Sequence, residues 1–116
     1  MRFMMMVKTA ENGVPPPQGL VDAMDKASEE AMRDGTMIDM GGLAATAMSA
    51  RVRLSDGKLA VTDGPFTEAK EVVGGYAVME LASKEKAVEH AVWLMNLHKE
   101  HWPGWEGEVE VRQIFA

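Results

Sequence analysis

The stretch YAVMELASKEKAVEHAVWLMNLH, residues 76–98, predicts a strand that leads directly into a helix. Its first six residues alternate along the chain, as in a strand with one buried face. Ser83 is a favourable N-cap, so we expect the helix to run from Lys84 to about His98. The apolar residues of this helix recur every three or four positions and form one stripe, which consists of Ala87, Val88, Ala91, Leu94 and Met95.

The two ends of the chain each predict a further strand. Beyond the helix, Pro103 and Gly104 end the helical pattern, and EVEVRQIF at residues 108–115 predicts the last strand. At the other end, the apolar run RFMMMVK at residues 2–8 predicts a buried first strand.

The segment between the first strand and the centre of the chain contains a second amphipathic pattern. A helix is expected from Gln18, with Asp34-Gly35 as its left-handed C-terminal cap. A short strand at 36–40 should end at the glycine pair 41–42, and residues 43–49 are expected to form a loop. The apolar stripe of this helix contains Leu20, Met24, Ala27 and Ala31.

A β-hairpin is expected in the middle of the chain. The segments ARVRL (50–54) and LAVTD (59–63) flank Asp56-Gly57, and such a pair suits a type I′ turn because both central residues need positive φ. The complete order is strand, helix, strand, hairpin, strand, helix, strand. This order predicts one α+β domain over residues 1–116, with the ferredoxin-like βαββαβ arrangement and an inserted β-hairpin.

A homodimer follows from the number of helices. Two helices can cover only one face of a four-stranded sheet, and the other face is also rich in apolar residues. Depending on the register, that face contains Met4, Met6, Tyr76 or Ala77, and Val78 or Met79. Packing against the same face of a second copy would bury it by two-fold symmetry, which predicts a dimeric α+β barrel.

Composition excludes several classes of site. The chain has no cysteine, which rules out disulfides, thiolate metal sites and cysteine nucleophiles. Its formal net charge of −6 argues against direct nucleic-acid binding and against binding to anionic membranes. No apolar segment has the length of an export signal or a membrane span. We therefore expect a cytoplasmic protein.

The string DGPFTEAKEVVGGYAVME, residues 63–80, closely resembles the signature of the DGPF-domain proteins, a branch of the YCII-related family. MRFMMMVK at the start and EVEVRQIF at the end are similar to that family as well. The resemblance implies a dimeric α+β barrel, and members are small-molecule binders or enzymes, some associated with extracytoplasmic-function sigma factors. Some YCII-related proteins pair an early histidine with a catalytic aspartate, but the first histidine here is His90, so that pair is not carried over.

Asp63 is the candidate catalytic residue. It ends a hairpin strand, where its carboxylate could act as a general base or hold a polar ligand at the mouth of a cleft. Phe66 would supply an apolar wall of that cleft. The alternative is that Asp-Gly-Pro only forms a turn, in which the aspartate bonds its own backbone.

Five further residues are candidate ligand contacts. Glu68, Lys70 and Glu71 could tune one another's pKa beside Asp63, or simply form a solvated surface. Tyr76 could donate a hydrogen bond to a ligand or fill an interface. The guanidinium of Arg112 could clamp a carboxylate or phosphate, and the alternative is an ion pair with Glu80 or Glu110.

No cofactor or metal is expected. Neither GxGxxG nor GxxxxGK[ST] occurs, so nucleotide binding through those loops is unsupported. HKEHWPGW at residues 98–105 has neither the HExxH nor the HxxEH spacing of zinc proteases, and no third ligand is evident. Its histidines favour the negative pole of a helix end, and Trp102 and Trp105 would pack over an edge or a pocket mouth.

Three functions are compatible with these patterns. The preferred one is a small-molecule-binding dimer, including an enzyme with acid–base chemistry on a polar or carboxylated metabolite. The alternative is a non-catalytic accessory or regulatory module associated with an extracytoplasmic-function sigma factor. An assembly domain without a ligand is the third. Polar residues that recur on otherwise apolar strands favour the first.

Overall fold

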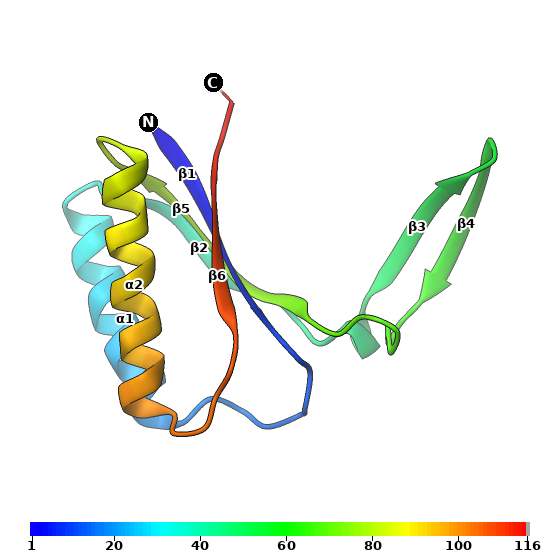
Figure 1. Ribbon diagram of the computed structural model, residues 1–116, viewed down its shortest axis with the longest axis horizontal. Helices are drawn as coiled ribbons and strands as arrows, with labels where there is room; N and C mark the ends of the chain where they lie inside the picture. Colours follow the sequence, from blue (N-terminus) through cyan, green and yellow to red (C-terminus); the bar gives the residue numbers. More distant parts are fainter. Residues whose placement is uncertain (116) are drawn as a thin grey trace.

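Residues 1–115, which the computed structural model describes, form an α+β fold with the expected order of elements (Figure 1). The two helices are α1 (Gln18–Arg33) and α2 (Lys84–His101), and a short 3-10 helix, η1, spans Thr46–Met48. The strands are β1 (Arg2–Thr9), β2 (Met37–Gly42), β3 (Ala50–Ser55), β4 (Lys58–Asp63), β5 (Val72–Glu80) and β6 (Glu108–Gln113).

Four strands form one sheet in the order β2-β5-β1-β6, and every neighbouring pair is antiparallel. Both helices lie on one side of this sheet, which is the ferredoxin-like arrangement (Figure 1). The register settles which residues share a face: Met5 lies opposite both Ala77 and Val111, and these three face the helices. The other side, here called the open face, contains Met4, Met6, Tyr76, Val78 and Arg112.

Local sequence signals place the helix ends. Gly35 adopts a φ of 84° directly after α1, as expected for a left-handed cap, and the side chain of Ser83 accepts a hydrogen bond from the Lys86 amide at 3.2 Å. Helix α2 continues past His98 to His101. It stops there because the residue before a proline, here Trp102, avoids the helical region.

Two expectations between α1 and β3 were wrong. Strand β2 does not end at the glycine pair but includes both glycines, since Gly42 pairs with Gly75 and the Leu43 amide continues the pairing to the Gly74 carbonyl at 3.0 Å. Residues 43–49 are not all loop, because η1 lies within them. Both differences arise from contacts with distant parts of the chain.

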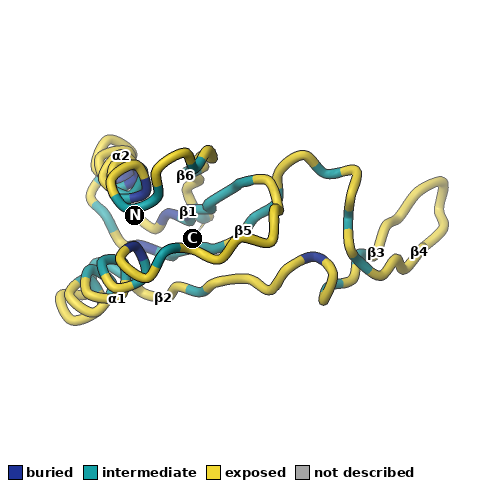
Figure 2. Tube along the Cα trace, turned by 90° about the horizontal axis from the view of Figure 1, so that it is seen from below, coloured by how far each residue is buried: buried dark blue, intermediate teal, exposed yellow. Residues whose placement is uncertain are grey.

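The core lies between the sheet and the helices and is small. Phe3, Leu20 and Met79 are almost fully buried, and Met5 and Ala87 extend the same cluster. Figure 2 shows the buried residues concentrated where the helices approach the sheet. Val88, expected in the buried stripe of α2, is 44% exposed, and the buried stripe passes through Ala87, Ala91 and His98 instead.

Strands β3 and β4 form a separate two-stranded hairpin, as the sequence predicts. Asp56 and Gly57 have φ angles of 52° and 73°, which are the positive values that a type I′ turn requires. The hairpin projects from the side of the sheet opposite the helices (Figures 1 and 2). Every residue of β4 is exposed.

Candidate functional site

A cavity of about 650 Å³ lies between the helices and the sheet. Small residues on its facing walls account for this space. Helix α1 contributes Ala27 and Ala31 to the lining, and the sheet contributes Gly42 and Gly75, which have short side chains or none. The segments around Asn12 and Leu43 line the cavity as well. The rest of the lining is mainly apolar and includes Met5, Val7, Leu20, Met24, Met37, Met40, Ala77, Met79 and Leu94.

The two glycines form a floor of bare backbone beneath the cavity. Gly42 lies directly opposite Gly75, in the row of β5 that also contains the helix-facing Ala77. Side chains of directly paired residues point to the same face of a sheet, so a side chain at position 42 would point toward the helices. A Cβ atom built there meets nothing within 4 Å. The absence of side chains at this pair therefore keeps the cavity open.

His98 is the buried polar residue of the cavity wall, with 5% of its surface exposed. Its Nδ1 lies 2.9 Å from the Leu94 carbonyl oxygen. Since a carbonyl oxygen can only accept, this contact assigns the hydrogen to Nδ1, and in that tautomer Nε2 carries the lone pair. Nε2 has no hydrogen-bond partner among residues 1–115, and no buried polar side-chain atom of this part of the chain is sealed off without a partner. Nε2 is therefore an available base at the cavity.

Aromatic rings surround this imidazole. The Trp105 ring lies 4.5 Å from the His98 ring, centroid to centroid, and Trp102 lies 6.1 Å from Trp105. All three residues line the cavity, which agrees with the expectation that the two tryptophans pack at a pocket. The wall around His98 is therefore aromatic.

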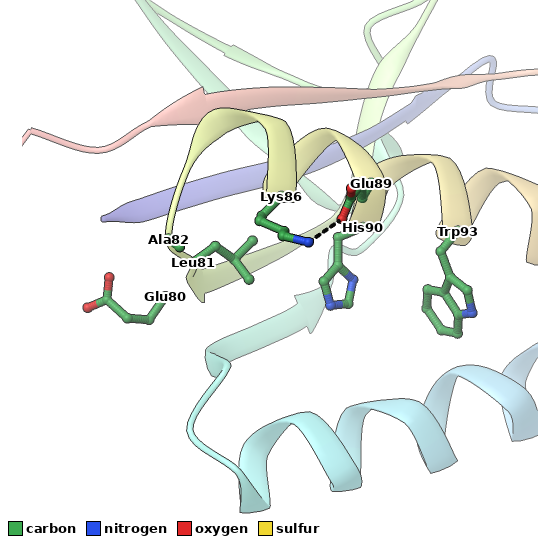
Figure 3. A pocket seen from close by; sticks show the side chains of 7 residues that line it. All are labelled: Glu80, Leu81, Ala82, Lys86, Glu89, His90 and Trp93. Atoms are coloured by element: carbon green, nitrogen blue, oxygen red, sulfur yellow. Dashed lines mark ion pairs between the residues drawn. The ribbon is translucent and has the colours of Figure 1, made fainter.

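His90 and Trp93 occupy the other end of α2. Figure 3 shows both side chains extending from α2 toward α1. They line the cavity and also an open groove on the outer surface beside Leu81 and Lys86, so they separate the two spaces. Burial lowers the pKa of His90, and the nearby negative charge of Asp34 opposes that shift in part. Burial at this end of the cavity therefore favours the neutral form of His90.

Tyr76 is the residue among the predicted ligand contacts that borders the cavity, but its side chain lies on the open face of the sheet, away from the helices. It lies on β5, and a Cβ atom built on Gly41 of the next strand would lie within 3 Å of its ring. Its hydroxyl donates a hydrogen bond to Asp39 Oδ2 at 3.2 Å. The charge of Asp39 and this hydrogen bond raise the pKa of Tyr76, so the phenol stays protonated and able to donate.

Arg112 lies on the open face of β6, opposite Met4. Within residues 1–115 it forms no ion pair, neither with Glu80 nor with Glu110. Glu80 instead pairs with the N-terminal amine at 2.7 Å, and its pKa is lowered mainly by that hydrogen bond. The guanidinium of Arg112 is therefore free of the ion pairs considered as alternatives.

The remaining predicted residues lie at the root of the hairpin. The Phe66 amide donates to Thr46 Oγ1 at 3.2 Å, and the Gly64 amide donates to the Ser49 carbonyl at 2.8 Å. These bonds fix the Asp63-Gly64-Pro65-Phe66 turn against η1. Thr46 also donates its amide and its hydroxyl to the Glu11 carboxylate, and these two bonds lower the pKa of Glu11.

A second set of contacts holds the chain after this turn. The Arg51 guanidinium lies 4.0 Å from the centre of the Phe66 ring and also binds the Glu68 carboxylate, whose pKa is lowered mainly by that hydrogen bond. Asp63, Lys70 and Glu71 are exposed. The hairpin and β6 occupy separate parts of the molecule, so one chain alone does not bring Asp63 and Arg112 together (Figure 1).

The comparison with known families fits this fold. A family model described as the YCII-related domain matches residues 1–115. The chain belongs to the YCII-related family. No curated protein matches this YCII-related chain. Its place in the DGPF branch stays a prediction.

The sequence did not lead us to propose His98 as a site residue of this YCII-related domain. Its burial could have been predicted from helical spacing, because the buried stripe of α2 consists of Ala87, Ala91, Leu94 and His98. The sequence pattern was interpreted instead as a helix end whose histidines favour the negative pole of the helix.

Within residues 1–115, no helix is long and apolar enough to cross a membrane. Nor do three or more His, Cys, Asp or Glu side chains of these residues gather as potential metal ligands.

Proposed function

We propose that this YCII-related chain binds a small, largely apolar molecule in the cavity between its helices and its sheet. One observation carries the proposal: a buried imidazole, His98, with an available Nε2 at an apolar cavity of about 650 Å³. That volume lies within the range of about 300–1,000 Å³ that is common for small-molecule sites. A few fixed polar groups in an apolar lining are also typical of such sites.

The lining indicates the chemistry of the ligand. Its apolar walls suit an aliphatic or aromatic body, and Nε2 of His98 suits one hydroxyl or one protonated carboxyl group as the donor. The ligand is therefore less polar than the sequence alone suggests, although a carboxylated metabolite still fits. Nε2 is also placed to take a proton from a bound molecule, which would make His98 a general base, and Asp63 is not needed for that step.

The functional unit in this proposal is a homodimer. The open face has Met4, Met6, Tyr76 and Val78 at its centre, and no helix covers it. Apolar sheet faces of this kind pack against a partner in stable proteins. Packing the open faces of two copies together would complete a dimeric α+β barrel.

A ligand screen tests the proposal. Trp93, Trp102 and Trp105 line the cavity, so their fluorescence should report binding directly. Aliphatic and aromatic compounds with one hydroxyl or carboxyl group are titrated, and hits are repeated by thermal shift. We expect at least one to bind, and we expect His98→Phe, which removes the acceptor, to weaken it at least tenfold.

Two leucine variants supply a matched comparison. Gly42→Leu fills the cavity from its floor, whereas Ala60→Leu adds a leucine side chain at an exposed position of the hairpin that does not line the cavity. Gly42→Leu should abolish binding and Ala60→Leu should preserve it. Equal binding by both variants would contradict the cavity as the site. If no compound binds the wild type, the sigma-factor association becomes the better hypothesis.

A further inference from the structure

The open face contains one row of side chains with opposite charges at its two ends. Across the sheet, Asp39 of β2 lies opposite Val78 of β5, which lies opposite Met4 of β1, which lies opposite Arg112 of β6. Directly paired residues project on the same face of a sheet. The row therefore presents an acid at one edge, a base at the other edge and two apolar side chains between them.

Neither charge of this row is neutralised within one chain. Asp39 accepts hydrogen bonds from the Tyr76 hydroxyl at 3.2 Å and from the Met40 amide at 2.9 Å, but it forms no ion pair within residues 1–115. Arg112 forms none within these residues either. The two edge strands are three strand spacings apart, or roughly 14 Å, so the two groups cannot reach each other in one chain.

We propose that the open face is self-complementary and that Asp39 of each copy pairs with Arg112 of the other copy. The inference rests on the homodimer of the proposed function and adds to it the alignment of the two sheets. A two-fold axis parallel to the strands, between β5 and β1, lays β2 of one copy over β6 of the other. Each Asp39 then faces an Arg112, and each Val78 faces a Met4.

The lengths of the side chains suit this contact. Packed sheets lie about 10 Å apart, and a long arginine side chain opposite a short aspartate can cross that distance. The hydrogen bond from Tyr76 fixes Asp39 on the open face before the two copies meet. Pairing therefore restricts mainly the arginine, which lowers the entropy cost of the ion pair.

The neighbouring row favours this alignment over another one. In the same strand order it contains Gly41, Tyr76, Met6 and Glu110. A two-fold axis across the strands, between the two rows, would lay Arg112 over Glu110 and Asp39 over Gly41. Asp39 would then lie at the interface without a cation, which is unfavourable for a short side chain held in place. In the proposed alignment Glu110 lies over Gly41, and its longer side chain can extend past the sheet edge to water.

Sedimentation equilibrium of charge-reversal variants tests the pairing. Arg112→Asp places an acid opposite Asp39 of the other copy, and Asp39→Arg places a base opposite Arg112. By symmetry each change creates two like-charge contacts, so we expect each variant to dimerise at least tenfold more weakly than the wild type. Glu110→Lys is the matched control: it reverses a charge that faces Gly41, and its dissociation constant should stay within about threefold of the wild type. All three positions are exposed, and circular dichroism checks that the variants fold.

Mixing the two weakened variants tests the pairing directly. An Arg112→Asp chain has acids at both positions and an Asp39→Arg chain has bases at both, so one copy of each restores both ion pairs. We expect a tagged chain of one variant and an untagged chain of the other to form a heterodimer with an affinity close to that of the wild-type dimer.

Three outcomes would overturn the proposal. The first is a mixture that forms no heterodimer, and the second is an Asp39→Arg variant that dimerises as tightly as the wild type. If Glu110→Lys is then the weakened variant, Arg112 pairs with Glu110 instead. The third is a monomeric wild type, which would also refute the homodimer. Ligand binding in the cavity is followed separately by tryptophan fluorescence, so its failure is distinguishable from these three.

Discussion

Replacing Gly64 by alanine should open the root of the hairpin, because a methyl group at this position would overlap the backbone of η1. A Cβ atom built on Gly64 lies 2.6 Å from the Thr46 carbonyl carbon and nearer still to its oxygen. Carbon atoms in contact are ~3.5 Å apart, so the turn and η1 would have to separate by about 1 Å. The glycine of this motif is therefore required for a close approach of two backbone segments.

The size of the effect follows from what the separation breaks. The hydrogen bonds from the Gly64 amide to Ser49 and from the Phe66 amide to Thr46 would be lost. Each such bond contributes about 1 kcal/mol, and forcing a methyl group into a packed site costs about 1–3 kcal/mol more. A loss of 3 kcal/mol or more corresponds to at least ~100-fold in the local opening equilibrium.

Amide hydrogen exchange measures this opening directly. Protection of the Gly64 and Phe66 amides should fall about 100-fold in the alanine variant, while the amides of β1 and β5 keep theirs. Gly74→Ala is the matched control, because a Cβ atom there meets nothing within 4 Å. If Gly64→Ala leaves the two amides within threefold of the wild type, the steric account of the motif is wrong.

Three further perturbations test the fold. Leu20 is fully buried, so Leu20→Ala should lower the free energy of unfolding in urea by about 2–5 kcal/mol, whereas Val92→Ala at a 53% exposed site of α2 should change it little; equal effects would contradict the position of the core. Ser83→Ala removes the cap of α2 and should cost about 1 kcal/mol in thermal denaturation, and Ser83→Asp should restore it; an unchanged melting temperature in the alanine variant would show that the cap is unimportant. Burial lowers the pKa of His90, so the unfolded chain binds the proton more readily than the folded one; the contribution of His90 to stability is complete above its ordinary pKa of 6.5 and is lost as the pH falls below it. Urea denaturation between pH 8 and pH 5 should show a smaller loss of stability in His90→Gln than in the wild type, and identical pH profiles would refute this account.

Local signals predicted most of the elements. Three features each depend on only a few neighbouring residues, and each lies where the sequence predicts it: the Asp56-Gly57 turn, the Gly35 cap and the Ser83 cap. The end of β2 was missed because it depends on Gly42 and Gly75, which are distant in sequence and meet only in the sheet. Glycine patterns show where a strand can end, but pairing decides where it does.

The candidate site was harder to predict for the same reason. The cavity exists because two walls of small residues face each other, Ala27 and Ala31 from α1 and the glycine pair from the sheet. The distance between these two walls cannot be predicted from the spacing of the residues along the sequence. His98 was missed because its place near the end of α2 concealed that it continues the buried stripe of that helix.

The run of three methionines in β1 affects how the chain finds its fold. Met5 points to the helices and Met4 and Met6 point away, so sliding the strand by one residue replaces methionine with methionine at all but the ends of the run. Such a slip changes little of the packing energy in the middle of the sheet, and competing alignments would be nearly degenerate. Phe3, which is 1% exposed, favours the native alignment because a slip would put Arg2 or Met4 at its buried position. Burial of this one aromatic ring thus contributes much of the difference in stability between the native alignment of the central strand and the shifted ones.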